Sequence, residues 1–169
     1  KQGEKVYLYF EGVYNRSEVF INGHSLGKRP NGYISFAYDA TPFLKYGADN
    51  SIAVKVDHSQ SADSRWYTGS GIYRDVWLVY SNPVHIAQWG VYVFPEVANG
   101  TGILNVEVAV ENGAAAKTKL TVVNELLDNT GKVVGKSFQN ILVDANAANK
   151  VATKISLKNP KLWNLENPN

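Results

Sequence analysis

Alternation of apolar and polar residues is the feature that most restricts how this 169-residue chain can fold. Apolar side chains occupy every second position over three segments, 51–57, 104–111 and 150–158. Successive side chains of a β-strand point to opposite faces, so this period gives each segment one apolar and one polar face. Shorter runs rich in aromatic and β-branched residues predict further strands at 6–10, 19–21, 34–38, 76–80, 91–94 and 120–123. The sequence therefore predicts an all-β chain.

Turn-forming residues separate the predicted strands. Asn22 and Gly23 both tolerate positive φ and lie between two apolar runs, which predicts a tight hairpin. The segment 128–131, Asp-Asn-Thr-Gly, predicts a second turn. The only hint of helix is at 41–46, where Thr41 could cap a single turn that begins with proline.

The residue types predict a domain boundary at Ser81-Asn82-Pro83, because proline cannot continue a β-ladder and its neighbours form turns. This boundary divides the chain into predicted domains at 1–82 and 83–169. The second has the short alternating strands of a small immunoglobulin-like sandwich, without the cysteine pair of antibody domains. The first has about five predicted strands, fewer than the roughly eight of a jelly roll.

Composition narrows the classes of partner. Seventeen basic and 15 acidic residues leave a net charge of +2, too small a field to indicate nucleic acid or an anionic membrane. The chain contains no cysteine, which excludes a disulfide framework and a thiolate metal site. No apolar run has membrane-spanning length, and no signal peptide is visible at the N-terminus. Neutral ligands are therefore favoured.

Several motifs, in order, resemble one enzyme family. The stretches are VYLYFEGVYNRSEVFINGHSLGKRPNGYISFAYDATPFL (6–44), NSIAVKVDHS (50–59) and SRWYTGSGIYRDVWL (64–78). They closely resemble the N-terminal sugar-binding module of glycoside hydrolase family two, which includes β-galactosidases, β-mannosidases and β-glucuronidases. The Pro-x-Leu-Trp-x-x-x-x-Pro motif at 160–168 matches the end of the immunoglobulin-like sandwich that follows in those enzymes. The resemblance spans the whole chain.

The resemblance implies a fold and a function. The fold is a jelly-roll (galactose-binding-like) sandwich truncated at its N-terminal strands, followed by an immunoglobulin-like sandwich also truncated at its end. The two catalytic glutamates of the family lie in a (β/α)₈ barrel beyond this point, so no residue of this chain is expected to be catalytic. The expected parent is a retaining exo-β-glycosidase, β-galactosidase-like, with no cofactor and no metal.

The resemblance also implies partners: a carbohydrate substrate and the barrel of the same polypeptide, with homo-oligomers compatible and neither nucleic acid nor membrane expected. The alternative is a stand-alone carbohydrate-binding or adhesion module, because a sandwich fold does not by itself choose a function. The sequence downstream of Asn169 distinguishes the two. The truncated jelly roll is further expected to leave an unpaired sheet edge near residues 6–10.

Candidate sugar contacts lie in the segment 60–70, which in related enzymes can reach the barrel and border the subsite for the terminal sugar. Its candidate residues are Asp63, Arg65, Trp66 and Tyr67. Aromatic faces stack on the C–H side of pyranose rings, and charged groups bond strongly to vicinal hydroxyls. The competing interpretation is that Arg65 and Trp66 fasten the jelly roll to its neighbour. Arg74 and Asp75 are expected to form a structural ion pair or an interdomain contact.

Other motifs have simpler explanations. Asp57-His58-Ser59 contains the residue types of a catalytic triad, but adjacent residues at a strand end point to alternate sides. The three histidines, His24, His58 and His85, lack the spacing of zinc ligands. The glycines in 69–71 lack the lysine and following helix of a phosphate loop, and are expected to allow a sharp turn before the next strand.

Overall fold

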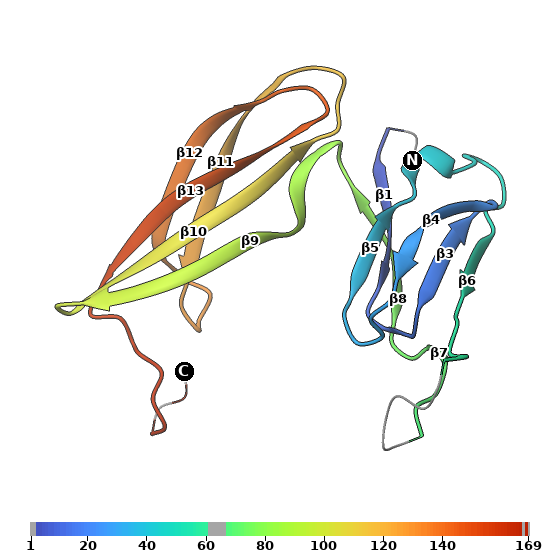
Figure 1. The fold of residues 1–169 in the computed structure, drawn as a ribbon. Coiled ribbons are helices and arrows are strands. Elements are labelled where there is room, and N and C mark those ends of the chain that lie inside the picture. The colour runs from blue at the N-terminus through green and yellow to red at the C-terminus, as the bar shows by residue number, and fades with distance from the viewer. Residues whose placement is uncertain (1–2, 61–66, 167, 169) are drawn as a thin grey trace. The chain divides into compact units, whose positions relative to one another are not determined.

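The computed structural model describes residues 3–60, 67–166 and 168 and divides into two compact units, Lys1–Asn82 and Pro83–Asn169. Nearly all of its regular structure is β-strand (Figure 1), so the predicted all-β fold is confirmed. In the part of the chain that is described, no helix has the length and apolar character needed to cross a bilayer.

The first unit contains eight strands and one 3₁₀ turn among its described residues. They are β1 (Lys5–Phe10), β2 (Val13–Tyr14), β3 (Ser17–Ile21), β4 (His24–Arg29), β5 (Phe36–Asp39), η1 (Thr41–Phe43), β6 (Ile52–Lys55), β7 (Gly71–Ile72) and β8 (Val76–Ser81). Two three-stranded antiparallel sheets, in the orders β5-β1-β8 and β4-β3-β6, form its layers, and β2 pairs with β7.

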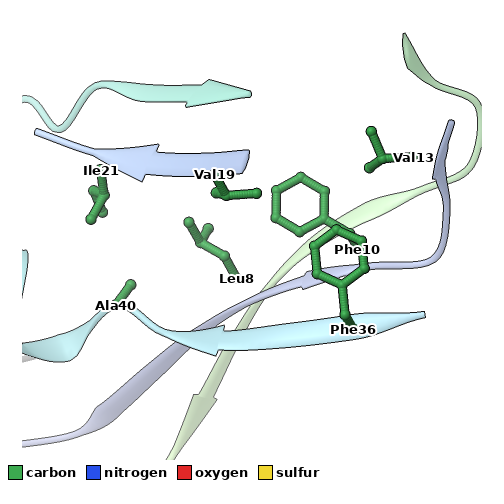
Figure 2. Packing of buried hydrophobic residues seen from close by; sticks show 7 residues of the cluster. All are labelled: Leu8, Phe10, Val13, Val19, Ile21, Phe36 and Ala40. Atoms are coloured by element: carbon green, nitrogen blue, oxygen red, sulfur yellow. The ribbon is translucent and has the colours of Figure 1, made fainter. Parts of the chain in front are cut away.

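The core of the first unit lies between these layers. Alternate residues of β1 and β3 point inward, and Leu8, Phe10, Val19 and Ile21 are at most 1% exposed. Phe36 of β5 stacks on Phe10 with ring centroids 5.1 Å apart, as Figure 2 shows. Burying such side chains contributes roughly 1.5–3 kcal/mol each. The alternation read from the sequence is thus what makes the sandwich.

The expectation of an unpaired edge at residues 6–10 is wrong. β1 is the central strand of its sheet and pairs along its length with both β5 and β8. Alternation shows which face of a strand is buried but carries no information on its lateral neighbours. Poor coverage is found at β8 instead: Leu78 and Tyr80 share the inward face of Leu8 and Val6 but are 47% and 55% exposed.

Local turn chemistry explains the connections. The predicted hairpin joins β3 to β4, with Asn22 at φ 50° and Gly23 at φ 85°. The Asn22 amide also donates to the carbonyl of Phe43, at 2.8 Å. The predicted cap is wrong, because η1 is preceded by Ala40 and has no side-chain cap. The Thr41 hydroxyl instead accepts a 2.8 Å hydrogen bond from the Val6 amide, which ties η1 to β1.

The second unit contains five longer strands among its described residues. They are β9 (Val84–Ala98), β10 (Thr101–Asn112), β11 (Thr118–Leu127), β12 (Val133–Val143) and β13 (Ala147–Lys158). One sheet has the order β13-β10-β9 and the other consists of β11 and β12. Valines of both sheets form the core, namely Val106, Val108, Val110, Val122, Val143 and Val151.

Asn112, at the end of β10, is 1% exposed and joins the two sheets of the second unit. Its side-chain amide donates to the carbonyls of Ala116 and Val143, at 2.9 and 3.1 Å, while its oxygen accepts from the Ala114 amide at 3.0 Å. A buried amide needs such partners, because leaving it unsatisfied would cost about 1–3 kcal/mol. The residue fixes the loop between β10 and β11 to the start of the β12–β13 connection.

Candidate functional site

The candidate segment 60–70 leaves the first unit beside Tyr14, a buried tyrosine of β2 with 6% exposure. β7 follows the segment directly and pairs with β2, with Tyr14 opposite Gly71. Gly71 has φ 116°, a backbone conformation that L side chains rarely adopt, so glycine suits the turn into β7. Residues 67–70 show neither a turn nor a bend, so the sharp turn predicted for 69–71 is not observed. The pairing of Gly71 with Tyr14 places the C-terminal end of the segment on β2.

His58 lies two residues before the other end of the segment. Its ring lies edge-on against the Tyr14 ring, with centroids 5.1 Å apart and planes at 84°. Its Nδ1 is 2.7 Å from the hydroxyl oxygen of Ser70, a hydrogen bond that spans 12 residues of sequence. The two ends of the segment are therefore joined to each other and to the same tyrosine.

Asp57 lies two residues beyond the end of β6, just before the segment. Its carboxylate accepts hydrogen bonds from the hydroxyl and the backbone amide of Ser59, at 2.5 and 3.0 Å. The bond from the Ser59 hydroxyl is the main cause that lowers the pKa of Asp57 below the ordinary aspartate value. This is a self-contained turn of the kind that aspartate forms with residues two positions on.

The loop before β5 approaches the same tyrosine. Tyr33, 65% exposed, lies edge-on to Tyr14 with centroids 5.4 Å apart. The Tyr73 hydroxyl donates a 2.7 Å hydrogen bond to the carbonyl of Gly32. A Cβ at Gly32 would lie 2.4 Å from Cδ2 of Tyr14, so a larger residue does not fit there without movement. Polar groups and exposed aromatic rings are therefore gathered at this end of the unit.

The structure places only part of the predicted site. Asp63, Arg65 and Trp66 lie outside the described residues. Tyr67 is described, with 95% of its surface exposed. Of the two alternatives predicted for Arg74 and Asp75, the ion pair does not occur in the described structure, and the interdomain contact stays a prediction. The Arg74 guanidinium lies 5.6 Å from the centre of the Tyr73 ring. The backbone carbonyl of Asp75 accepts a 3.1 Å hydrogen bond from the Glu11 amide.

The motifs set aside on sequence grounds do not form catalytic arrangements. In Asp57-His58-Ser59 the serine hydroxyl donates to the aspartate, while the histidine bonds to Ser70. His24 stacks on Phe43, and His85 lies 3.5 Å from a carboxylate oxygen of Glu111. Within the described ranges, no group of three or more histidine or acidic residues could hold a metal ion.

Sequence reasoning missed the contacts that organise this region. Tyr14, Gly32, Tyr33 and Tyr73 received no functional interpretation, although they determine where the segment emerges. Tyr14 and His58 are 44 positions apart in the sequence, and Gly32 and Tyr73 are 41 apart. Only the tertiary fold brings such residues together. The one available signal was the density of tyrosine and glycine in the quoted motifs.

Comparison with known proteins matches both units to models of one family. The model for the glycosyl hydrolases family 2 sugar binding domain matches residues 1–83, and the model for glycosyl hydrolases family 2 matches residues 84–169. A β-galactosidase of Bacteroides ovatus, BoGH2A, is 41% identical over 95% of this chain. A protein of Formosa agariphila described as a putative β-glucuronidase is 40% identical over 96% of it.

Solved structures agree on the fold. A glycosyl hydrolase family 2 member from Bacteroides cellulosilyticus superposes with a TM-score of 0.89 at 29% identity, covering 99% of this chain and 23% of that one. A β-glycosidase from Bacteroides vulgatus gives a TM-score of 0.83 at 41% identity, covering 99% and 20%. The present chain spans only 19% and 15% of the length of the two sequence relatives named above.

Proposed function

The chain belongs to glycosyl hydrolases family 2, and from that premise we propose that it is the non-catalytic framing part of a retaining exo-β-glycosidase that removes terminal β-linked sugars, with β-galactosides as the preferred class. The observation that carries the proposal is the match of two consecutive family models over 1–83 and 84–169, the first of which is described as sugar binding. Relatives with names of both β-galactosidase and β-glucuronidase support a sugar substrate.

Catalysis itself is assigned to the rest of the parent polypeptide. Retaining hydrolysis requires two carboxyl groups about 5 Å apart across the scissile bond, held rigidly by their scaffold. The family resemblance assigns these glutamates to a barrel that follows the second sandwich. No residue of this chain is proposed as a nucleophile or as a general acid.

The domains proposed from the sequence, 1–82 and 83–169, are completed in the parent by further strands. Inward-facing residues of edge strands support this, because they are half-exposed: Leu78 and Tyr80 in β8, and Val91 and Val93 in β9. In a finished sandwich such side chains are covered by the opposing sheet. We assign the covering strands to sequence that precedes Lys1 in the first domain and follows Asn169 in the second.

Sugar contacts from this chain are assigned to Arg65 first, and then to Asp63, Trp66 and Tyr67. The 95% exposure of Tyr67 supports the assignment, because aromatic rings at a surface can stack on a pyranose. A guanidinium keeps its charge at any working pH and presents donors in a fixed plane, which suits two neighbouring hydroxyls. The segment would thus act on the substrate from outside the catalytic domain.

Activity measurements test the proposal that catalysis resides in the rest of the parent polypeptide. The full-length parent should hydrolyse nitrophenyl β-galactoside, assayed beside the β-mannoside and β-glucuronide, whereas the purified 169-residue chain should show no turnover above background. Turnover by a clean sample of the chain alone would contradict the proposal. So would a parent without a barrel and without activity on any of the three substrates.

Substitution of Arg65 tests the contact. In the full-length protein, Arg65→Ala should reduce kcat/KM by about 1.5–3 kcal/mol of transition-state stabilisation, the usual worth of a charge-assisted hydrogen bond. Arg65→Lys keeps the charge but not the planar fork and should recover only part of the loss. The melting temperature should hardly change in either variant. Wild-type kinetics in Arg65→Ala would return this residue to a purely structural role.

A further inference from the structure

Four Asn-Gly pairs occur in the chain, and their asparagine side chains are held to different degrees. The pairs begin at Asn22, Asn31, Asn99 and Asn112. A glycine after asparagine carries no Cβ to shield its backbone nitrogen, so this nitrogen can approach the side-chain carbonyl carbon of the asparagine. Each pair is therefore chemically able to react with itself, and the hydrogen bonds of the asparagine decide whether it can do so in the folded protein.

Hydrogen bonds hold Asn22 and Asn112 firmly. The Asn22 amide group donates to the Phe43 carbonyl and to Oδ1 of Asn50, both at 2.8 Å. Its oxygen accepts from the Ser51 amide at 3.0 Å. Asn112 is 1% exposed and has the buried partners described above. Neither side chain can rotate without breaking several bonds.

Asn31 and Asn99 are exposed, and they differ in their hydrogen bonds. Asn31 Oδ1 accepts a 2.8 Å hydrogen bond from the Tyr33 amide. The Asn99 side chain has no hydrogen-bond partner among the described residues. In the described turns and loops, no backbone hydrogen bond has the Gly100 amide as its donor. At this pair, both groups that must meet are therefore available.

Asn22 and Asn99 form a matched pair for comparison. Each lies in a two-residue turn, Asn22 with Gly23 between β3 and β4, and Asn99 with Gly100 between β9 and β10. The φ angle is 50° at both asparagines, and it is 85° and 73° at the two glycines. The turns thus agree in sequence and in φ, and they differ in the bonds of the asparagine side chain.

We propose that Asn99 is a site of spontaneous modification, where the asparagine converts to aspartate and isoaspartate in the folded protein. The Gly100 nitrogen loses its proton to hydroxide, attacks Cγ of Asn99 and forms a C–N bond that closes a succinimide ring. The Cγ–Nδ2 bond breaks, and the side-chain nitrogen takes a proton from water and leaves as ammonia, which restores the hydroxide. Water then adds to either ring carbonyl and opens the ring to a carboxylate. No oxidant or reductant is needed.

Isoaspartate at position 99 would alter the β9–β10 turn. In this product the chain runs through the former side-chain carbon, which lengthens the backbone between Asn99 and Gly100. The Gly100 carbonyl accepts a 2.8 Å hydrogen bond from the amide of Asn159, directly after β13. A lengthened turn moves this carbonyl, so hydrogen exchange of the Asn159 amide should become faster.

The test follows all four asparagines in one sample of the full-length parent. The protein is incubated in mildly alkaline buffer, and peptide mapping by mass spectrometry measures conversion at each site. A typical hydrogen bond resists opening by roughly two- to tenfold, so Asn99 should convert at least about tenfold faster than Asn22 with its three bonds. Asn31 should convert at an intermediate rate, and Asn112 most slowly.

Incubation in urea is the matched control. Unfolding removes the side-chain hydrogen bonds, so the four sites, which share one dipeptide, should then convert at similar rates. Conversion of Asn22 as fast as Asn99 in the folded protein overturns the inference. So does an Asn99 that converts in urea but stays unchanged in the folded protein. The outcome does not depend on whether the parent is a glycosidase.

Hydrogen exchange of the Asn159 amide tests the altered turn. Asn99→Asp introduces the negative charge without lengthening the backbone, and exchange in this variant should stay near the wild-type rate. In protein converted to isoaspartate, exchange should be up to about tenfold faster, as expected for the loss of one hydrogen bond. Equal exchange in the converted protein and in Asn99→Asp would contradict the altered turn.

Discussion

At the scale of single residues, Tyr14 is the side chain on which the candidate site depends. Its ring contacts Tyr33 and His58, and Gly32 approaches it more closely than any other residue type could. These neighbours come from two segments, the loop before β5 and the residues that follow β6. A substitution that moves the Tyr14 ring should therefore also displace these neighbouring segments.

Replacement of Gly32 by alanine tests this dependence. The added Cβ would lie 2.4 Å from Tyr14 Cδ2 and 3.1 Å from the Asn15 Cβ, so the ring must shift. Overpacking of this kind usually costs about 1–3 kcal/mol, and the free energy of unfolding of the first unit should fall by that amount. Hydrogen exchange of the β1 amides in increasing urea measures it. Gly69→Ala is the control, because its Cβ meets nothing within 4 Å; equal stability of the two variants would refute the argument.

Asp39 makes the first unit sensitive to acid. Burial alone would raise its pKa, but hydrogen bonds from Thr41 and Lys5 outweigh burial and hold the pKa below the ordinary 3.8. A carboxyl whose pKa is lowered by folding contributes stability above its unfolded pKa, and that contribution is lost as pH falls through the folded value. The Lys5 ammonium lies 3.0 Å from the carboxylate.

The corresponding prediction compares melting temperatures across pH. Asp39→Asn should be less stable than wild type near pH 6, and the difference should shrink as the pH falls through the pKa of the folded wild-type carboxyl, which lies below 3.8. Lys5→Met should reduce the same pH dependence, since it removes one of the groups that favour the charged form. A constant difference between wild type and Asp39→Asn at all pH values would contradict this account.

At the scale of strands, side-chain pattern predicted where strands form but not how they are arranged. The alternation at 104–111 and 150–158 falls within β10 and β13, which pair with each other. β9 runs over 15 residues, although only 91–94 were expected to be extended. The register shifts between Ile86 and Val91 of β9, opposite Val108 and Val110 of β10, and this irregularity interrupts the pattern. The order of strands within a sheet, such as the place of β1 between β5 and β8, depends on pairing between strands that are distant in sequence.

The candidate site was likewise predicted only in part from the sequence. Its segment and its sugar-contact residues followed from family resemblance, which is carried by local motifs. The contacts that hold the segment, such as His58 with Tyr14 and Ser70, join positions 12 to 44 residues apart. No local pattern encodes such a contact.

Leu8 and Leu78 lie opposite each other in the β1–β8 ladder. Substituting each in turn tests how side-chain burial differs between the two strands. Leu8 is 1% exposed and Leu78 is 47% exposed. In the 169-residue chain, Leu8→Ala should cost about 2–5 kcal/mol of unfolding free energy. Leu78→Ala removes a side chain that is already half in water and should cost less than about 1.5 kcal/mol. Urea unfolding measures both.

The same pair examines the proposed covering strands. In the full-length parent, Leu78→Ala should become markedly more costly, because the additional strands bury its side chain, while the cost of Leu8→Ala should stay about the same. An unchanged small cost for Leu78→Ala in the parent would argue against strands that cover β8.

At the scale of the whole chain, the two units have separate cores, and Asn82 and Pro83 alone separate β8 from β9. Limited proteolysis with proteinase K should therefore cut first within 60–69 or at 81–83, where β8 ends and Asn82 and Pro83 connect it to β9. Mass spectrometry of the early fragments identifies the sites. An early cut within 104–110, the centre of β10, would contradict the division into two units.

β9 has a consequence for handling the protein. It is an edge strand of the described structure, and Val91, Tyr92, Val93 and Phe94 are 45–62% exposed in an uninterrupted, uncharged run. An open edge of this composition is a template for pairing with other chains and a typical aggregation segment. The 169-residue chain expressed alone should therefore self-associate through this strand. A lysine in place of Val93 would make it more soluble, because a charge on an exposed edge opposes intermolecular pairing.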